Sequence, residues 1–351
     1  MSDITILHKK IGMKYSPFII AEMSGNHNQS LFTAMKIVEA AAIAGADALK
    51  IQTYTADTMT ISTRSTDFVV SDKKSPWHNQ SLHELYQQAY TPWEWHQAIF
   101  DRCKELGMIG FSSPFDESAV DFLETLNVPP CYKIASFECT DIPLIKKVAS
   151  TKKPMIISTG MSSIAEIDET VLTAKNAGCE DIILLKCTST YPASPMHSNL
   201  KTIPNMKEVF QCQVGLSDHT LGIGTAIASV VLGASVIEKH LTLSREDGGV
   251  DASFSLEPHE LRMLVEESKS AWQAIGNVHY GPTEAEINSK SYRRSLYITE
   301  DMQKGEELTK SNLRVIRPGF GLAPKYYDVL LGKKVNKNIS RGTALTWDIV
   351  E

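Results

Sequence analysis

Long apolar runs are missing from this sequence. No stretch approaches the roughly 20 consecutive apolar residues that a membrane-spanning helix needs. The first ten residues, Met-Ser-Asp-Ile-Thr-Ile-Leu-His-Lys-Lys, lack the apolar segment of a secretory signal peptide. We therefore expect a protein of the cytoplasm that has no membrane as a partner.

Basic clusters and paired cysteine motifs are missing as well. The 351 residues include 35 Lys and Arg against 41 Asp and Glu, a formal net charge of −6, which argues against nucleic acid as a partner. The six cysteines show no C-x-x-C spacing, so buried, reduced thiols are the default expectation. Cys187, between Lys186 and Thr188, is the one cysteine to consider as an alternative nucleophile.

The sequence also lacks a G-x-G-x-x-G motif after its first strand, which counts against a dinucleotide-binding fold. It has instead a repeated unit of a short apolar strand followed by a helix. Such alternation predicts a parallel sheet, and eight strands in roughly 260 residues fit a (β/α)8 TIM barrel. A doubly wound open sheet is the alternative. The expected strands are 17–22, 48–53, 108–113, 131–136, 154–159, 181–188, 213–216 and 234–237, and the expected helices are 31–44, 93–106, 117–126, 142–149, 164–177, 222–233 and 258–275.

The residue pattern of the chain changes after the last of these helices. A polar, turn-rich stretch leads into short apolar segments that are broken by glycines. We expect a barrel domain at 1–280, a linker at 281–292 and a small β-rich domain at 293–351. Within the small domain, Asp301-Met-Gln-Lys-Gly-Glu306 and Asn338-Ile-Ser-Arg-Gly-Thr343 look like two copies of one turn.

The segment from about Thr55 to Tyr90 is the longest insertion between the expected elements of the barrel. Loops of this length in compact domains are usually functional or disordered. Because it follows the second strand at the carboxyl-terminal rim, we expect it to cover the substrate.

Two histidines occupy equivalent places in neighbouring units, in Ser217-Asp218-His219-Thr220 and in Glu238-Lys239-His240. Each follows an apolar run, and a small-residue helix separates the two. This connection brings the histidines to one rim on neighbouring strands, which lie roughly 4.8 Å apart. One divalent cation could then bind both imidazoles; the alternative is two unrelated polar strand ends.

Polar residues end most of the other strands, where Val, Ile and Leu are expected to fill the barrel. A buried ammonium is costly without a partner, so either carboxylates neutralise the three lysines among them or the site holds an anion. The hydroxyls nearby favour a phosphate or phosphocarboxylate. Glu22 and Asp251 beside the imidazoles would complete a metal centre with open positions, as catalysis requires. The polar residues are Glu22, Lys50, Gln52, Ser113, Lys133, Ser136, Glu138, Lys186, Ser189, Tyr191, Ser217, His219 and His240.

With these residues the chain resembles the sialic acid synthase family, whose members condense phosphoenolpyruvate with an N-acetylated sugar aldehyde. The resemblance runs essentially end to end, and the C-terminal region resembles the antifreeze-protein-like (SAF) domain of that family. Its motifs here are Ile20-Ala-Glu-Met-Ser-Gly-Asn-His27, Lys50-Ile-Gln-Thr, Ser112-Ser-Pro-Phe, Tyr132-Lys-Ile-Ala-Ser, Gly215-Leu-Ser-Asp-His-Thr, Glu238-Lys-His and Arg317-Pro-Gly. The finer pattern looks most like the pseudaminic acid synthase branch, as in Gln52-Thr-Tyr-Thr-Ala-Asp-Thr-Met59, Tyr90-Thr-Pro-Trp-Glu-Trp95 and Ile134-Ala-Ser-Phe-Glu138.

The resemblance implies a role for each candidate residue. His219 and His240 match metal-binding histidines that usually hold Mn²⁺ or Mg²⁺. Glu22 matches the acidic residue near the acceptor and the metal. Ser189 stands where family members typically have Asn, and Lys186 where they have His. Positions that hold phosphoenolpyruvate correspond to Lys50, Ser113, Lys133, Ser136, Ser189 and Ser217, and those that hold the sugar to Gln52, Tyr191, Asp251 and Arg317.

The implied reaction joins C3 of phosphoenolpyruvate to the sugar aldehyde, adds water at C2 and releases phosphate by C–O cleavage. The product would be pseudaminic acid, made from 2,4-diacetamido-2,4,6-trideoxy-L-altrose. A domain-swapped homodimer is implied too, with Arg317 reaching the partner's site. The alternatives are a legionaminic or N-acetylneuraminic acid synthase, a Schiff-base aldolase with Lys133 or Lys186 as nucleophile, and a non-catalytic carbohydrate-binding protein.

Overall fold

The computed structural model describes residues 2–73, 75, 77–126 and 129–351. The chain forms two compact units, Met1–Gly276 and Asn277–Glu351. None of the helices in these described ranges is both long and apolar enough to cross a membrane.

The first unit is built on eight parallel strands that close into a barrel, in the order β10-β3-β4-β5-β6-β7-β8-β9. This confirms the predicted (β/α)8 barrel, and the alternative prediction of a doubly wound open sheet is wrong. Every strand is formed almost entirely by buried residues, as expected where helices cover the outer face. The strands are β3 (Phe18–Glu22), β4 (Ala48–Thr53), β5 (Ile109–Pro114), β6 (Tyr132–Ile134), β7 (Met155–Ser158), β8 (Ile182–Cys187), β9 (Gln213–Ser217) and β10 (Val236–His240).

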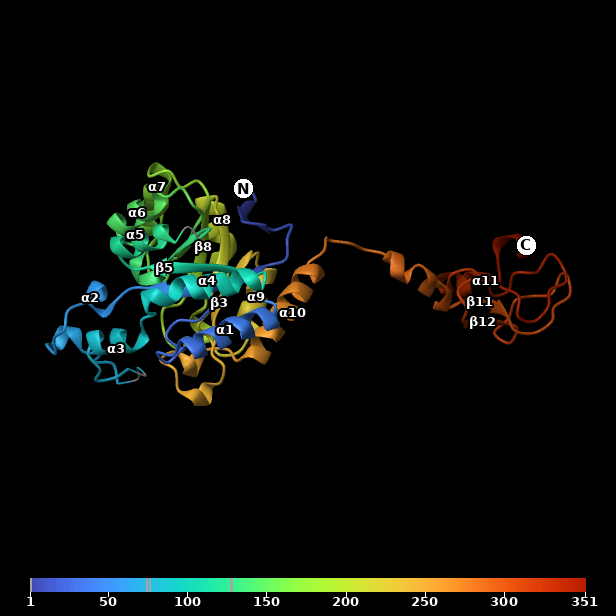
Figure 1. Cartoon of the computed structure of the whole chain (residues 1–351). Coiled ribbons are helices and arrows are strands. Elements are labelled where there is room, and N and C mark those ends of the chain that lie inside the picture. The colour runs from blue at the N-terminus through green and yellow to red at the C-terminus, as the bar shows by residue number, and fades with distance from the viewer. Residues whose placement is uncertain (1, 74, 76, 127–128) are drawn as a thin grey trace. The chain divides into compact units, whose positions relative to one another are not determined.

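Helices alternate with the strands and lie around them (Figure 1). All seven predicted helices are present, and α8 forms at the end of a stretch that the sequence pattern left broken. Local signals set their ends. The Ser30 side chain caps the first turn of α1, and Gly45 ends that helix at a φ of 88°. The helices are α1 (Leu31–Ala44), α4 (His96–Glu105), α5 (Glu117–Thr125), α6 (Ile142–Ala149), α7 (Ile164–Asn176), α8 (Thr202–Phe210), α9 (Gly224–Val231) and α10 (Pro258–Ala274).

A short antiparallel hairpin, β1 (Ile4–Ile6) and β2 (Lys9–Ile11), precedes the barrel. Sequence analysis did not predict it. Its isoleucines pack in one buried cluster with inward-facing strand residues such as Phe111 and Ile183. The hairpin therefore fills the amino-terminal end of the barrel largely with apolar side chains.

The insertion after β4 contains α2 (Ala56–Met59) and α3 (Leu82–Ala89), which contact each other beside the barrel (Figure 1). The isolated bridge between Val69 and Ser81 closes the loop between the two helices. Positions 74 and 76 of the expected substrate-covering loop lie outside the described residues.

The second unit has its own apolar core and a two-stranded antiparallel sheet of β11 (Ser295–Ile298) and β12 (Leu313–Ile316). The predicted repeat of a turn is visible in the backbone. Gly305 and Gly342 adopt φ angles of 88° and 87°, and the bridge between Met302 and Ile339 joins the segments before them. The segment 339–345 makes only isolated bridges and forms no longer strand.

Candidate active site

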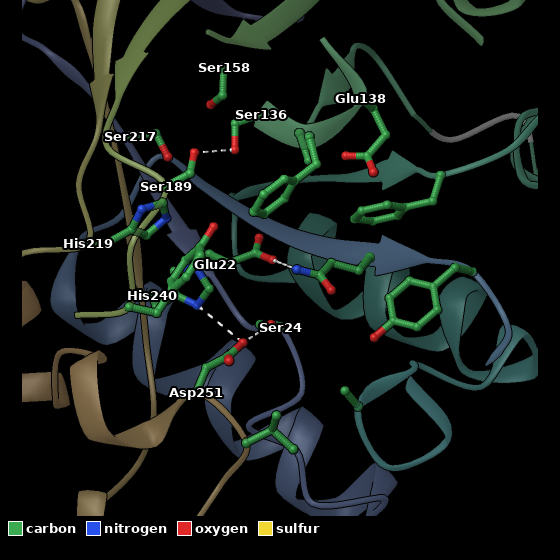
Figure 2. A pocket seen from close by; sticks show the side chains of 18 of the residues that line it. Glu22, Ser24, Ser136, Glu138, Ser158, Ser189, Ser217, His219, His240 and Asp251 are labelled. Carbon is green, nitrogen blue, oxygen red and sulfur yellow. Dashed lines mark hydrogen bonds and ion pairs between the residues drawn. The ribbon is translucent and has the colours of Figure 1, made fainter. Parts of the chain in front are cut away.

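The strand register brings the predicted polar residues to one end of the barrel. His240 lies opposite Glu22, and Glu22 lies opposite Lys50, on three neighbouring strands. A pocket of about 340 Å³ opens there (Figure 2). Twelve of the residues predicted for the site line it: Glu22, Lys50, Gln52, Lys133, Ser136, Glu138, Ser189, Tyr191, Ser217, His219, His240 and Asp251.

Three predicted positions are not in the pocket lining. Ser113 is buried opposite Gln52 in the register, and its Oγ has no hydrogen-bond partner. Arg317 is exposed and belongs to the second unit. The prediction that Lys186 shares the mouth with Lys50 and Lys133 is wrong. Its Nζ donates hydrogen bonds to the Cys187 carbonyl and the Thr188 hydroxyl, while the next residue along the pleated strand, Cys187, faces the pocket.

Two lysines and two glutamates form a buried charge cluster in the floor of the pocket. Lys50 Nζ lies 2.7 Å from Glu22 Oε2 and 3.7 Å from Glu238 Oε1, and Lys133 Nζ lies 3.5 Å from the same Glu238 atom. Two explanations were open for the buried lysines, neutralisation by carboxylates or binding of an anion. The structure shows neutralisation by carboxylates for Lys50 and Lys133. Glu238 was missed as a site residue. It is two residues before His240 on one strand, so the period of two could have placed both on the inner face.

Burial and charge act against each other in this cluster. Burial raises the pKa of Glu22 above its ordinary value, although Lys50 acts to lower it. Burial would also raise the pKa of Glu238, but Lys133 and Lys50 outweigh it and the pKa is lowered. Burial lowers the pKa of Lys133, while the two carboxylates hold the pKa of Lys50 above its usual range. Glu238 is therefore the fixed anion of the cluster, and Glu22 is the carboxyl that takes up a proton more readily.

Hydroxyl groups gather on the other wall, where Figure 2 shows Ser136, Ser158, Ser189 and Ser217 close to His219. The hydroxyls of Ser136 and Ser189 are 2.7 Å apart, and the buried Oγ of Ser158 has no hydrogen-bond partner. Gly160 has a φ of 48°, and a Cβ there would lie 2.6 Å from Ser136 Cβ and 2.7 Å from Ser189 Oγ. The chain keeps this space free for donors that can converge on an anion. Ser158 was missed, although it is the last residue of β7.

The two histidines meet at the edge of the pocket with ring centroids 5.4 Å apart. His219 Nδ1 is 3.0 Å from the Thr188 carbonyl oxygen. A carbonyl can only accept, so Nδ1 carries the proton and Nε2 keeps its lone pair. His240 Nδ1 is buried without a hydrogen-bond partner, 3.6 Å from an Asp251 oxygen. Burial lowers the pKa of His240 well below its ordinary value, which keeps this imidazole neutral, as a metal ligand must be.

The donor set thus fits a divalent cation. A backbone carbonyl that orients a ligating imidazole is the usual outer support of such sites. Within the described ranges, no group of three or more His, Cys, Asp and Glu side chains is arranged to hold a metal ion. The two histidines would be the main protein ligands, leaving the other coordination positions to substrate and water.

Cys187 completes this edge, with Sγ 3.9 Å from His219 Nδ1. Burial would raise the pKa of this thiol, but the hydrogen bond with His219 and the charge of Lys133 act against it and the pKa is lowered. In return, the pKa of His219 is raised against the effect of its burial. All six cysteines are free and buried, as expected.

Four further polar residues, Gln52, Ser24, Tyr191 and Glu138, also line the pocket. Gln52 donates a hydrogen bond to Glu22 Oε1 at 2.9 Å, and Ser24 donates one to Asp251. Tyr191 packs on the His219 ring with centroids 4.5 Å apart. Burial raises the pKa of Glu138 to about 7, and its Oε2 has no hydrogen-bond partner. Below about pH 7 this carboxyl is mostly protonated and can donate a hydrogen bond to a ligand.

A parallel barrel with charged and hydroxyl side chains at the carboxyl ends of its strands is typical of barrel enzymes. A model of the NeuB family matches residues 37–280, and a model of the SAF domain matches residues 293–351. The chain belongs to the NeuB family, which confirms the resemblance seen in its motifs.

Relatives of known name cover nearly the whole chain. Pseudaminic acid synthases of Campylobacter jejuni and Helicobacter pylori are 43% and 39% identical; the matches cover 93% and 97% of this chain and 95% and 99% of theirs. An N,N'-diacetyllegionaminic acid synthase of Legionella pneumophila is 36% identical over 98% of this chain and 97% of its own. The crystal structure of Bacillus subtilis spore coat polysaccharide biosynthesis protein SpsE matches with a TM-score of 0.67 at 33% identity, covering 100% of this chain and 99% of that one.

Proposed function

We propose that this protein is a pseudaminic acid synthase. It condenses phosphoenolpyruvate with 2,4-diacetamido-2,4,6-trideoxy-L-altrose and water, and gives pseudaminic acid and phosphate. The observation that carries the proposal is the pocket itself, where two buried lysines and a cluster of serine hydroxyls face a pair of histidines. The names of the relatives from Campylobacter jejuni and Helicobacter pylori support the same reaction.

The phosphate and carboxylate of phosphoenolpyruvate would bind between the lysines and the serine hydroxyls. Lys50 and Lys133 supply charge, while Ser136, Ser189 and Ser217 supply donors. The Oγ atoms of Ser158 and Ser113 have no hydrogen-bond partner and could donate further hydrogen bonds to the ligand. Because burial favours the protonated form of Glu22, the cluster can gain a positive charge when the anion enters.

His219 and His240 would hold the divalent ion, Mn²⁺ or Mg²⁺. When bound, that ion supplies a Lewis acid for the acceptor carbonyl. Asp251 lies 3.6 Å from His240 and accepts a hydrogen bond from Ser24, so its carboxylate is placed to orient the imidazole and a sugar hydroxyl. Gln52 and Tyr191 would position the rest of the acceptor.

The bond changes follow from this placement. The C2=C3 double bond of phosphoenolpyruvate opens as C3 forms a bond to the aldehyde carbon, and Glu22, protonated when the anion entered, gives its proton to the aldehyde oxygen, which becomes a hydroxyl. The positive character that develops at C2 is stabilised by the carboxylate of Glu238. Water adds at C2 and Glu22, which Lys50 and Gln52 hold in place, accepts its proton. The bond between C2 and the bridging oxygen then breaks, the C2 hydroxyl loses its proton to the departing phosphate as the keto group forms, and phosphate leaves beside Lys50 and Lys133.

The small domain would complete the site of a second subunit. In this part of the proposal the chain forms a domain-swapped homodimer, with residues 281–292 as the linker between the barrel domain 1–280 and the SAF domain 293–351. Arg317 is exposed on the SAF domain, where it can bind an acetamido group of the acceptor. A symmetric exchange of this kind closes at two subunits.

Legionaminic acid synthesis is the second candidate, because a legionaminic acid synthase is also similar along nearly the whole chain. The test is an assay with phosphoenolpyruvate, Mn²⁺ and each of three acceptors, with phosphate release and product mass as readouts. The acceptors are those that lead to pseudaminic, legionaminic and N-acetylneuraminic acid. The highest kcat/KM should belong to the altrose derivative. A higher value for another acceptor would reassign the substrate, and no phosphate release with any of them would overturn the proposal.

A further inference from the structure

The inner and outer parts of the pocket differ in chemistry. Apart from Asp251, the charged, hydroxyl and imidazole groups of the pocket described above lie on the barrel strands or shortly after them. The outer wall is formed by the insertion between β4 and β5 and by residues beyond the strand ends, and most of its side chains are apolar. The reaction as proposed uses none of these apolar groups.

Helix α3 supplies much of this outer wall. Leu82, Leu85, Tyr86 and Ala89 all line the pocket, with the i, i+3, i+4, i+7 spacing of a single helix face. Such a stripe normally packs against a core, but here it lines a cavity. A capping box between Ser81 and Glu84 fixes the start of the helix.

Aromatic rings extend the apolar wall and hold it in place. Tyr54 packs edge-on against Tyr86 and Phe115, with ring centroids 5.7 and 5.2 Å away. Trp77 packs near Tyr191 with centroids 5.9 Å apart, and its indole N–H donates a hydrogen bond to the Val250 carbonyl. The polar atom of Trp77 is thus engaged with the protein, and its ring faces the pocket.

The position of each carbon along the acceptor chain determines which of its groups lies against the outer wall of the pocket. The aldehyde carbon must reach the phosphoenolpyruvate and the histidines on the strands. C6, at the other end of the hexose chain, is the carbon farthest from the aldehyde and extends toward the opening. A hydroxyl at C6 would lose water against Leu85 and Val70, whose side chains offer no partner, whereas a methyl group would be favoured there.

We propose that the outer wall is a specificity subsite for acceptors with a methyl group in place of the terminal hydroxymethyl group. This inference rests on the proposed function and names the residues that select its 6-deoxy substrate. Leu85, Val70 and Trp77 form the subsite. An apolar pocket rejects an added hydroxyl only moderately, so we expect a preference of about 10- to 100-fold in kcat/KM.

The test compares two acceptors that differ by one oxygen atom: 2,4-diacetamido-2,4,6-trideoxy-L-altrose and its counterpart with a hydroxyl at C6. Each is assayed with phosphoenolpyruvate and Mn²⁺ on the wild type, Leu85→Asn and Val70→Thr. Both substitutions keep the approximate side-chain size and add a hydrogen-bonding group. The wild type should prefer the deoxy acceptor, and each variant should reduce that preference at least about fivefold, within the discrimination expected of such a pocket.

Leu172→Asn is the matched control, since Leu172 is half exposed on α7 and should leave the preference unchanged. Thermal melting checks folding, and Val70→Thr carries the test if Leu85→Asn does not fold. Equal kcat/KM for the two acceptors on the wild type would overturn the subsite while leaving the synthase reaction intact. A preference that neither folded variant reduces would do the same. Failure of every acceptor would instead overturn the proposed function.

Discussion

Lys239 donates a hydrogen bond from Nζ to Asp218 Oδ2 at 2.9 Å, and both side chains are buried. The same ammonium donates to the Thr220 carbonyl at 2.6 Å. Lys239 stands between Glu238 and His240, which line the pocket, so the pleat turns it to the opposite side of β10. This ion pair links the carboxyl-terminal ends of two neighbouring strands, where the two histidines lie, on the side that faces away from the pocket.

Breaking this ion pair should destabilise the barrel. Lys239→Met leaves the Asp218 carboxylate buried without its partner, for which we expect a loss of about 3–5 kcal/mol. Adding Asp218→Asn removes that charge and should restore most of the stability. Urea unfolding followed by circular dichroism measures both. Arg262→Ala, which removes an exposed ion pair on α10, should change little. A double variant no more stable than Lys239→Met would contradict this account.

The two histidines should be required for binding of Mn²⁺, measured by electron paramagnetic resonance without substrates. His219→Ala and His240→Ala should each weaken the affinity by at least about 100-fold, above the range for removal of supporting residues alone. His259→Ala, an exposed histidine, should not. Because the pKa of His219 is raised from its ordinary value of 6.5, protons compete with the ion for it, and affinity should already fall as the pH drops to 6.5. Undiminished binding to either variant would remove the histidines from the metal site.

Glu138 should make stability depend on pH. Its pKa is about 7 in the folded protein, raised by burial from an ordinary value of 4.5. Between these values the unfolded chain loses the proton and the folded protein keeps it, so folding stability falls as pH rises through 7. The melting temperature of Glu138→Gln minus that of the wild type should therefore increase from pH 4.5 to above 7. Glu267→Gln, at an exposed site on α10, is the control. A difference that stays constant with pH would show that Glu138 is not held neutral.

Arg317 should act on the site of the other subunit. Arg317→Ala and Lys133→Ala should each be inactive alone, and co-expression should restore activity because each heterodimer contains one intact site. Random mixing makes about half of the dimers heterodimeric with one good site of two, so roughly a quarter of wild-type activity should return. Confirmed heterodimers without any recovery would rule out the swapped arrangement.

The barrel could be predicted because its signals are local. Apolar runs of strand length alternate with helical patterns, and caps such as Ser30 and Gly45 mark the helix ends. The hairpin before β3 could not be predicted in this way, because Ile4, Ile6 and Ile11 are recognisable as a plug only once the barrel has closed over them.

The site was harder to predict where the role of a residue depended on whether its side chain points into the barrel. Listing polar residues near strand ends found His240 and Lys50 but could not tell Lys186 from Cys187, because the pleat decides which of two neighbours faces inward. The same list omitted Glu238, which precedes His240 by two residues and lies on the same inner face of the strand. The apolar wall of α3 carries no catalytic residue type, so its place at the pocket emerged only from the fold.

The central claim is that phosphate leaves by cleavage of the C–O bond after C–C bond formation, and one isotope measurement tests it directly. Phosphoenolpyruvate labelled with ¹⁸O at the bridging oxygen is converted with the altrose acceptor and Mn²⁺, and both products are analysed by mass spectrometry. Lysines that surround a departing phosphate predict that the label appears in inorganic phosphate and the keto acid carries none. Label retained in the keto acid would mean cleavage of the P–O bond and would contradict the account.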